Sequence, residues 1–315
     1  MILIFSIDYE TSTSIVEEWL LHYGGIFFRI NETTFITDID YTTNRLTVNT
    51  NLGKQVDFSK VKSVWFRRGR LQVKFALPKN IDKAKYAPIL DNEKQEAKAL
   101  SDFLINKLSE KKCISDFSNM SPNKLMVLEM AKSIGLEIPD TIITTKKESI
   151  KNYFKNRKII NKNISDVVHC NIDKKVYYNR TTEIYSNKIP VSFSPSCIQQ
   201  MIEKKYELRI FYFDGRCYSM AIFSQSNKKT NVDFRNYDYK NPNREVPFIL
   251  PATIEKKLKK LMKKLKLNTG SIDIIVTPDN KYIFLEVYPV GQFGMVSVPC
   301  NYQLEKLIAA KLMRA

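Results

Sequence analysis

Two strand-like segments near the end of the sequence, "GSIDIIV" and "KYIFLEVY", each carry one carboxylate inside an apolar run. A Pro-Asp-Asn turn joins them, so we expect two antiparallel strands in which Asp273 and Glu286 approach each other on one face. Burial of two uncompensated charges there would be very costly, so a cation should lie between them. The pattern predicts either Mg²⁺, which binds carboxylates together with nucleotide phosphates, or an ion pair with a lysine or with Arg209.

A second pair of charged side chains lies upstream, in "KYELRIF". Glu207 and Arg209 alternate with apolar neighbours, so both side chains point to the same side of the predicted strand. One interpretation is a cross-strand ion pair. The other is a ribose acceptor beside a phosphate clamp, because a guanidinium presents a fixed fork of donors to phosphate oxygens. The residues alone leave both interpretations open.

The opening of the chain alternates strand-like and helix-like segments. "MILIFSID" has the apolar run of a buried strand, and "TSTSIVEEWLLHYGG" has the capping candidates, apolar face and terminal glycines of a helix. Strand-like stretches follow, which predicts an α/β domain through about residue 115. With 315 residues the chain exceeds one ordinary core, and a turn at 116–122 indicates a boundary. We expect three domains, at residues 1–115, 116–200 and 201–315.

The middle of the sequence continues this alternation. A helix should begin near Pro122 and end at Gly135, and Pro139 should lead into a strand. "SIKNYFKNRKIINKNIS" offers another helix followed by a strand. Asp214 and Gly215 lie between two apolar runs, which is a good signal for a β-hairpin.

Fifty Lys and Arg residues against 33 Asp and Glu residues give a net charge of +17, which predicts an anionic partner. Nucleic acid is one such partner. Against it, the lysines are scattered or lie on one predicted helix, residues 253–268, whose Leu258, Leu261 and Leu265 recur at helical spacing. We interpret this helix as a solvated basic face over a buried apolar stripe, and we expect no nucleic-acid partner.

No long uncharged apolar run is present, so neither a membrane span nor a secretory signal is expected. The five cysteines are widely spaced and never form a Cys-x-x-Cys pair, and the sequence has two histidines. These counts argue against a zinc site and against a histidine-based triad. The interpretation is a reduced, cytoplasmic protein without a membrane partner.

The order of these elements resembles an ATP-grasp ligase, with a basic strand "KIINKNIS", a hinge "QMIE", the "YELR" strand and the two carboxylate strands. The resemblance implies an ATP-grasp α/β fold with an N-terminal pre-ATP-grasp domain, a small central domain and a C-terminal domain. It also implies ATP and Mg²⁺ as cofactors, with the hinge against adenine and the glutamate of "YELR" on ribose. The implied nucleotide contacts are Lys124, Lys162, Gln200, Met201, Ile202, Glu203, Glu207 and Arg209, and the implied metal positions are Asp273, Glu286 and Tyr288.

Further segments narrow the resemblance. "VWFRRGR", "VDFRNYD" and "FLEVYPVGQFG" are similar to the ATP-grasp enzymes that macrocyclise ribosomal peptides, the graspetide or microviridin-type ligases, and the chain is most similar to their grasp-with-spasm branch. The family implies that ATP phosphorylates an Asp or Glu side chain of a precursor peptide. A Ser or Thr hydroxyl, or a Lys amine, of the same peptide then closes an ester or amide ring. The precursor would join a leader to an acidic core, and a homodimer is a candidate assembly. We expect the leader to contact the hairpin at Asp214 and Gly215.

The resemblance also implies roles for basic residues. Arg209 and Arg235 would hold the acyl phosphate, where charge develops on the transferred group. Arg67 and Arg68 would bind carboxylates of the peptide. The alternative for this second pair is a role as surface charges that follow a buried Trp65.

The sequence departs from the family pattern at one position. Two residues beyond Glu286 the family has Asn, whose carbonyl oxygen suits magnesium, and this chain has Tyr288. A phenol with a pKa of about 10 is a larger and poorer ligand. We therefore expect weakened occupancy of one metal site, with Asp273 and Glu286 retained. Two alternatives stay open: an ATP-grasp ligase for a small molecule or a protein terminus, and a nucleotide- or peptide-binding homologue with impaired catalysis.

Overall fold

The computed structural model describes residues 1–74, 82, 84–155, 157–165, 169–172, 175–178, 182–184, 189–225 and 242–314. The chain forms two compact units: Met1–Met120 with Phe293–Ala315, and Ser121–Gln292. The C-terminal segment therefore packs with the N-terminal unit. Helices and strands mix in both units, which confirms the predicted α/β class. The division into three domains stays a prediction.

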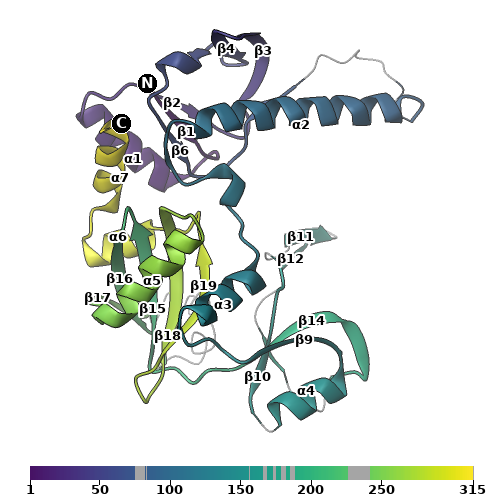
Figure 1. Ribbon diagram of the computed structural model, residues 1–315, viewed down its shortest axis with the longest axis vertical. Helices are drawn as coiled ribbons and strands as arrows, with labels where there is room; N and C mark the ends of the chain where they lie inside the picture. Colours follow the sequence, from purple (N-terminus) through teal and green to yellow (C-terminus); the bar gives the residue numbers. More distant parts are fainter. Residues whose placement is uncertain are drawn as a thin grey trace. The chain divides into compact units, whose positions relative to one another are not determined.

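A parallel sheet of order β2-β1-β6-β8 forms the centre of the N-terminal unit. Strand β1 is buried along its whole length, as expected for a parallel strand with helices on both faces. Helix α2 packs on one face through Leu104 and Leu108, and α7 lies against the other, where Oγ of Ser63 donates to the carbonyl of Leu312 (Figure 1). The bounds are β1 Ile2–Phe5, α1 Thr11–His22, β2 Phe27–Ile30, β6 Ser63–Phe66, α2 Ala87–Ser109, β8 Lys112–Ile114, α6 Gly294–Cys300 and α7 Leu304–Met313.

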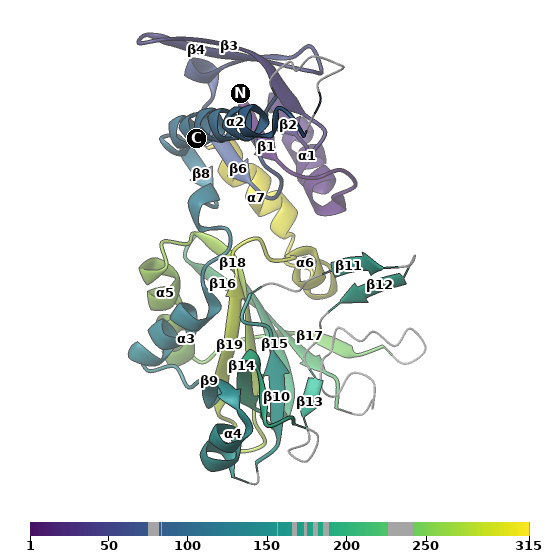
Figure 2. The same cartoon turned by 90° about the vertical axis from the view of Figure 1, so that its right-hand side faces the viewer.

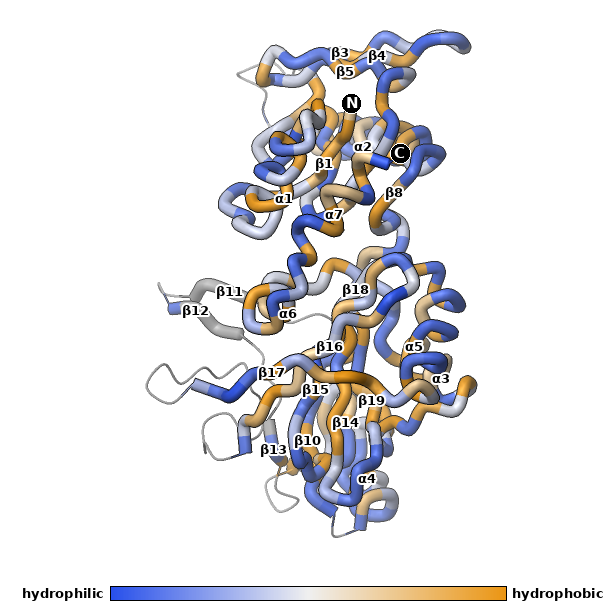
Figure 3. Tube along the Cα trace, turned by 90° about the vertical axis from the view of Figure 1, so that its left-hand side faces the viewer, coloured by the Kyte–Doolittle hydropathy of each residue, from blue (hydrophilic) through white to orange (hydrophobic). Residues whose placement is uncertain are grey.

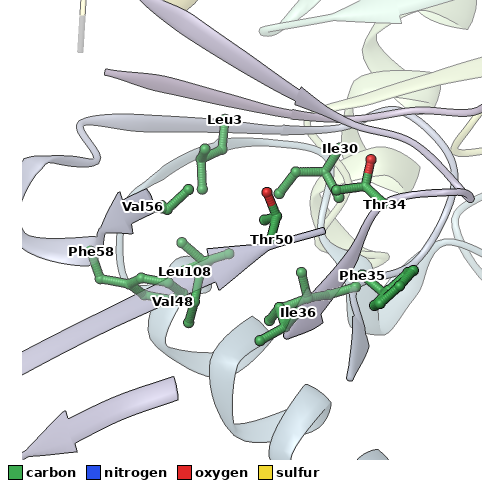
Figure 4. Close-up of a pocket in the computed structure, with 11 residues that line it drawn as sticks. Leu3, Ile30, Thr34, Phe35, Ile36, Val48, Thr50, Val56, Phe58 and Leu108 are labelled. Carbon is green, nitrogen blue, oxygen red and sulfur yellow. The ribbon is translucent and has the colours of Figure 1, made fainter. Parts of the chain in front are cut away.

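A second four-stranded sheet, of order β5-β4-β3-β7, shares the core on the α2 side. Leu3, Ile36, Val48 and Leu108 help to line a cavity of about 10 Å³ in this core (Figure 4). A cavity of that size is at the lower limit for one water molecule, so it is a packing void and not a ligand site. The bounds are β3 Phe35–Thr42, β4 Arg45–Thr50, β5 Gln55–Asp57, β7 Gln72–Val73, and the 3₁₀ turns Phe58–Lys60 and Phe117–Asn119.

The second unit contains a sheet of order β13-β10-β14-β9 that carries helix α4 on one face (Figure 2). Ile150 and Phe154 of α4 pack with Ile159 and Ile198 of the sheet and form a small separate core. The bounds are β9 Thr141–Lys146, α4 Lys147–Phe154, β10 Ile159–Lys162, β13 Thr182–Ile184 and β14 Ser192–Gln200, with a two-stranded pair β11 His169–Ile172 and β12 Lys175–Tyr178.

The same unit holds an antiparallel sheet of order β17-β16-β15-β18-β19. One face of this sheet, with Leu208, Ile210 and Ile272, packs with helices α3 and α5 in the largest core of the unit. Because successive side chains of a strand alternate between faces, the neighbouring residues Glu207 and Arg209 point to the opposite face. The bounds are α3 Lys124–Ser133, β15 Tyr206–Phe213, β16 Arg216–Phe223, β17 Arg244–Phe248, α5 Ala252–Lys264, β18 Thr269–Val276 and β19 Tyr282–Tyr288.

Helix α5 confirms the interpretation of the lysine-rich segment. Leu258, Leu261 and Met262 are fully buried, while most of its lysines are exposed and colour the helix as hydrophilic (Figure 3). None of the helices that the structure describes is both long enough and apolar enough to cross a bilayer.

The predicted ends of one helix and the predicted hairpin of the second unit are also confirmed. Helix α3 begins at Lys124, where Oδ1 of the N-cap Asn123 accepts from two backbone N–H groups, and it ends just before Gly135. Strands β15 and β16 form the hairpin, and Asp214 and Gly215 both have positive φ, 47° and 84°. Positive φ at both central residues is the requirement of a type I′ hairpin turn.

Candidate active site

A row of three charged side chains crosses the five-stranded sheet. Arg209 of β15 pairs in register with Asp273 of β18, which pairs with Glu286 of β19. Nη1 of Arg209 donates to Oδ1 of Asp273 at 2.7 Å and to Oδ2 at 2.8 Å. Both side chains are buried. Of the two kinds of cation that the sequence predicts beside Asp273, the structure shows the guanidinium of Arg209.

A β-bulge brings Glu286 into this row. Phe284 pairs with Ile274 and Glu286 pairs with Asp273, so Leu285 is an extra residue in β19. In an unbroken strand Glu286 would point to the same face as Phe284, which is fully buried in the core under the helices. The bulge reverses this alternation and delivers the carboxylate to the polar face of the sheet.

Tyr288 lies on the same face as Glu286 and contacts it directly. Its hydroxyl donates to Oε2 of Glu286 at 2.8 Å. Nζ of Lys124, in the first turn of α3, lies 5.4 Å from the centre of the Tyr288 ring and donates to the carbonyl of Ser165 at 3.0 Å. Lys124, Glu286 and Tyr288 therefore form one connected cluster.

Glu207 lies on this face two residues before Arg209. Its Oε1 accepts from Nζ of Lys204, and it also accepts from Oγ of Ser224 at 3.3 Å. All of these side chains are buried. The ion pair between Glu207 and Arg209 that the sequence allowed is not formed, because Arg209 pairs with Asp273 and Glu207 pairs with Lys204. Sequence reasoning missed Lys204 and Ser224, although a lysine three positions before Glu207 was a visible signal.

The expected hinge links β14 to β15 and is anchored at its start. The backbone N–H of Gln200 donates to the carbonyl of Asp140 at 2.9 Å. Arg157 donates from Nη1 to Oε1 of Gln200 at 3.2 Å and forms an ion pair with the carboxylate of Asp140. The other expected hinge residues are Met201 and Ile202, which are half-buried, and Glu203, which is exposed.

Lys162 ends strand β10 and lies opposite Cys197 of β14. Its position in the strand alternates with Ile159, so its side chain points away from the core beneath α4. Burial raises the pKa of the Cys197 thiol, and the positive charge of Lys162 opposes that rise. The ammonium group of Lys162 is therefore close to Cys197, on the face of the sheet β13-β10-β14-β9 that is opposite to α4.

Arg67 and Arg68 follow strand β6 in the N-terminal unit. The Arg67 side chain is 4% exposed, and its Nη2 donates to Oε1 of Glu10 at 3.2 Å. Nε of Arg68 forms an ion pair with Oε2 of Glu10 at 3.1 Å, and this side chain is 31% exposed. The alternative that both are surface charges is therefore wrong for Arg67. Sequence reasoning did not predict Glu10.

Two expected contacts complete the set. The hairpin residues Asp214 and Gly215 are exposed at the tip between β15 and β16. Arg235 lies outside the described residues. The structure thus brings Glu207, Arg209, Asp273, Glu286 and Tyr288 together on one sheet face.

Comparison with known proteins shows which families and solved structures this chain is similar to. Residues 1–121 match the family model of the MvdD pre-ATP grasp domain. No curated protein matches the chain. A crystal structure of the macrocyclase MdnC from Microcystis aeruginosa MRC, bound with precursor peptide MdnA, is 25% identical, with a TM-score of 0.78 over 100% of this chain and 99% of that chain.

Two further solved structures share the fold. The RiPP-associated ATP-grasp ligase of Chryseobacterium gregarium, in complex with ADP and a leader and core peptide, is 22% identical, with a TM-score of 0.80 over 99% of this chain and 94% of that chain. The ATP-grasp ligase PsnB, complexed with minimal precursor, Mg and ADP, is 14% identical, with a TM-score of 0.71 over 99% and 97% of the two chains.

The fold and its N-terminal domain define an ATP-grasp ligase. Within this class, the chain is similar to the ATP-grasp maturases of ribosomally synthesised and post-translationally modified peptides, as the sequence resemblance implied.

Proposed function

We propose that this ligase forms ADP while it activates Asp or Glu side chains of a ribosomal precursor peptide as acyl phosphates, which Ser or Thr hydroxyls, or Lys amines, then attack to close rings. The observation that carries the proposal is the register row of Arg209, Asp273 and Glu286 on one sheet face, in a chain with this fold. Phosphorylation of a peptide carboxylate needs a cationic group that stabilises the transferred phosphoryl group. It also needs protein carboxylates that can hold a metal ion beside that group.

The residues of this row suit Mg²⁺ with ATP. Magnesium is bound in proteins through one or two carboxylates plus phosphate oxygens, and Asp273 and Glu286 are register partners. No three His, Cys, Asp or Glu side chains gather as a metal cluster in the described part of the chain, so the remaining ligands would have to come from the nucleotide and water. ADP and Mg in the structures of PsnB support ATP and Mg²⁺ as the cofactors.

Each remaining side chain has a role that follows from its chemistry. ATP with Mg²⁺ supplies the phosphoryl group that turns a carboxylate into an acyl phosphate. Lys124 and Lys162 would hold phosphate oxygens, and Glu207 would accept a hydrogen bond from a ribose hydroxyl, since a buried carboxylate favours a donor. Arg209 would bind the acyl phosphate, because a guanidinium presents a fork of donors that fits a dianion, and only its Nη1 donates to Asp273 in the hydrogen bonds described above. Gln200, Met201, Ile202 and Glu203 would border the adenine.

The outer contacts would belong to the peptide. The structure of the Chryseobacterium gregarium ligase holds a leader and a core peptide, which supports a bipartite precursor as the partner. We assign the leader to the exposed hairpin at Asp214 and Gly215, and Arg235 to the acyl phosphate. The net charge of +17 suits both an acidic core and a nucleotide triphosphate. We place the reaction in the cytoplasm, and assembly into a homodimer stays a prediction.

A turnover experiment tests the proposal. The chain is incubated with ATP, Mg²⁺ and a candidate precursor encoded beside its gene, and ADP release and the mass of the peptide are followed together. We expect ADP release that depends on the peptide and loss of one water for each ring formed. ADP release without loss of water, or water loss without ATP, would contradict the assignment.

One observation favours a second candidate function. Tyr288 binds Glu286 through its hydroxyl at the position where the family has a magnesium ligand, and Lys124 lies over its ring. A homologue that binds nucleotide and peptide but turns over poorly would have such a site. Tight binding of ATP and precursor with no ADP release would favour this candidate over the ligase.

A further inference from the structure

The carboxyl ends of β1 and β6 lie next to each other in the middle of the parallel sheet of the N-terminal unit. The chain leaves β1 for β2 on one side and leaves β6 for β8 on the other. In open α/β sheets, ligands bind in the crevice outside the carboxyl ends of the strands at such a switch point. In this chain the crevice is bordered by residues 6–10 after β1 and residues 67–70 after β6.

The loop after β6 is held firmly against β1. The backbone N–H groups of Arg67 and Arg68 both donate to the carbonyl of Phe5, at 3.0 Å and 2.9 Å. Gly69 has a φ of +73°, and a Cβ at this position would lie 2.2 Å from the carbonyl oxygen of Ser6. Only glycine can occupy so close an approach in this conformation. The backbone that carries the two arginines is therefore fixed before any ligand arrives.

Glu10 lies between the two guanidinium groups, and each of its oxygens faces one of them. The Arg67 guanidinium also lies 5.1 Å from the centre of the Phe293 ring, which closes its other side. Burial would raise the pKa of the Glu10 carboxyl, but Arg67, Ser12 and Arg68 outweigh that effect and lower it. Glu10 is thus a carboxylate at neutral pH and neutralises one of the two positive charges.

The two arginines differ in what they can still bind. Arg67 is enclosed by Glu10 and Phe293, and its side chain is 4% exposed. The Arg68 side chain is 31% exposed and uses its Nε edge for Glu10. Among the described residues, no hydrogen bond engages the terminal nitrogens of Arg68. These nitrogens have the fork geometry that binds a carboxylate through two parallel hydrogen bonds.

We propose that Arg68 is the docking point for an acidic side chain of the peptide substrate, and that Glu10 and Arg67 are positioning residues that hold it. This inference rests on the proposed function, and it divides the predicted arginine pair into one binding residue and one supporting residue. The group bound is the carboxylate of an Asp or Glu side chain. A surplus of one positive charge in the cluster gives this carboxylate its affinity.

Direct binding tests the site without any turnover. The chain is labelled with ¹⁵N-arginine, and the Nε–Hε resonance of Arg68 is identified by its absence in Arg68→Lys. The probes are the synthetic peptide acetyl-Thr-Asp-Thr-Glu-amide and its neutral counterpart acetyl-Thr-Asn-Thr-Gln-amide. We expect a saturable shift of the Arg68 resonance with the acidic peptide alone, and a smaller change at Arg67. An equal response to both peptides, or a shift caused by ATP and not by the acidic peptide, would overturn the proposal.

Kinetic measurements on two variants that each lose one arginine then test the docking site separately from the ligase function. Arg68→Gln should raise KM for the precursor about tenfold with kcat within about twofold, since hydrogen bonds to a charged group carry energies of that order. Arg70, which is exposed and two positions away, supplies the control, and Arg70→Gln should leave KM within about twofold. Equal KM values for the two variants, with an active wild type, would remove the docking site and leave the ligase function intact. A wild type without peptide-dependent turnover would remove the ligase function and leave the binding experiment as the test of Arg68.

Discussion

The hydroxyl of Tyr288 donates a hydrogen bond to Oε2 of Glu286 at 2.8 Å, so the residue in the place of the family's asparagine is a direct partner of the expected metal ligand. Lys124 lies 5.4 Å from the centre of the same ring, which suits a cation–π contact. The hydroxyl of Tyr288 and a metal cation would compete for the same carboxylate oxygen of Glu286. We therefore expect the tyrosine to act on Mg²⁺ binding through Glu286.

Replacement of Tyr288 by asparagine tests this relationship. Tyr288→Asn removes the competing hydroxyl and supplies an amide carbonyl, which is an oxygen ligand that magnesium accepts. We expect higher peptide-dependent ATP turnover and a magnesium concentration for half-maximal rate that is lower by about threefold or more, since a single neutral oxygen contributes roughly as much as a hydrogen bond. The measurement is a magnesium titration of both proteins with the same precursor.

Tyr288→Phe serves as the matched control, because it removes the hydroxyl and keeps the ring under Lys124. If competition for Glu286 is the main effect, Tyr288→Phe should bind Mn²⁺, a spectroscopic substitute for Mg²⁺, more tightly than wild type. Weaker Mn²⁺ binding by Tyr288→Phe, or a less active Tyr288→Asn, would mean that the tyrosine positions Glu286 usefully and is not a defect.

Glu286→Gln examines the metal assignment itself. The amide keeps the shape of the side chain and removes the charge that would face the cation. We expect peptide dehydration to be abolished while the fold is retained, because Glu286 is half-buried on the polar face and its neighbour Val287 holds the core. Product analysis by mass spectrometry checks the first part and circular dichroism the second. Undiminished product would remove Glu286 from the site.

The ion pair between Arg209 and Asp273 should serve function at the expense of stability. Their side chains are 9% and 13% exposed, so Asp273→Asn leaves a nearly buried guanidinium without its counter-charge and should lower the free energy of unfolding by about 3 kcal/mol. The double variant Arg209→Met/Asp273→Leu removes both charges and should recover most of that loss while staying inactive. Urea unfolding measures both. A double variant as unstable as the single one would show that the pair stabilises the fold.

Recognition of the precursor should depend on its leader. An enzyme that activates several different acidic side chains gains substrate affinity best from a segment remote from the reacting groups. Core peptide without its leader should therefore be a poor substrate, with most of the loss in kcat/KM. An equally good reaction of the core alone would refute this dependence.

Asp214→Asn tests the assigned hairpin, since it retains a residue that tolerates positive φ and removes the charge.

The elements that carry the site could be predicted from local patterns. Alternation of apolar and charged residues predicted that Glu207 and Arg209 share a face, and the Pro-Asp-Asn turn predicted that the strands of Asp273 and Glu286 are antiparallel neighbours. The prediction that the lysines of α5 form a solvated face is also correct, since the spacing of Leu258 and its neighbours is a property of a single helix. These features depend on residues close together in the chain.

What could not be predicted depends on contacts between distant residues or on a local irregularity. Nothing in "YIFLEVY" marks Leu285 as the bulged residue, yet without the bulge Glu286 would point into the core. Glu10 precedes Arg67 by 57 positions, so the ion pair that buries Arg67 follows only from the packing of β1 beside β6. The choice of Asp273 over Glu207 as the partner of Arg209 likewise depends on Lys204, which occupies Glu207.

Glu10 and Glu17 should affect stability with opposite dependence on pH. The pKa of Glu10 is lowered below 4.5, because Arg67, Ser12 and Arg68 outweigh the effect of its burial, so its stabilising contribution is complete above pH 4.5 and is lost as the pH falls through its folded pKa. The pKa of Glu17 is raised above 4.5 by burial, which Arg29 only partly offsets, so its carboxylate penalises the fold as the pH rises from 4.5 through its folded pKa.

We expect the stability difference between wild type and Glu10→Gln to grow as the pH rises from about 3 to about 7, a range that covers the usual titration of a glutamate. The difference between wild type and Glu17→Gln should change in the opposite direction over the same range. Thermal unfolding of the three proteins across these pH values measures both slopes, and slopes of equal sign would show that the arginines do not hold Glu10 in its charged form.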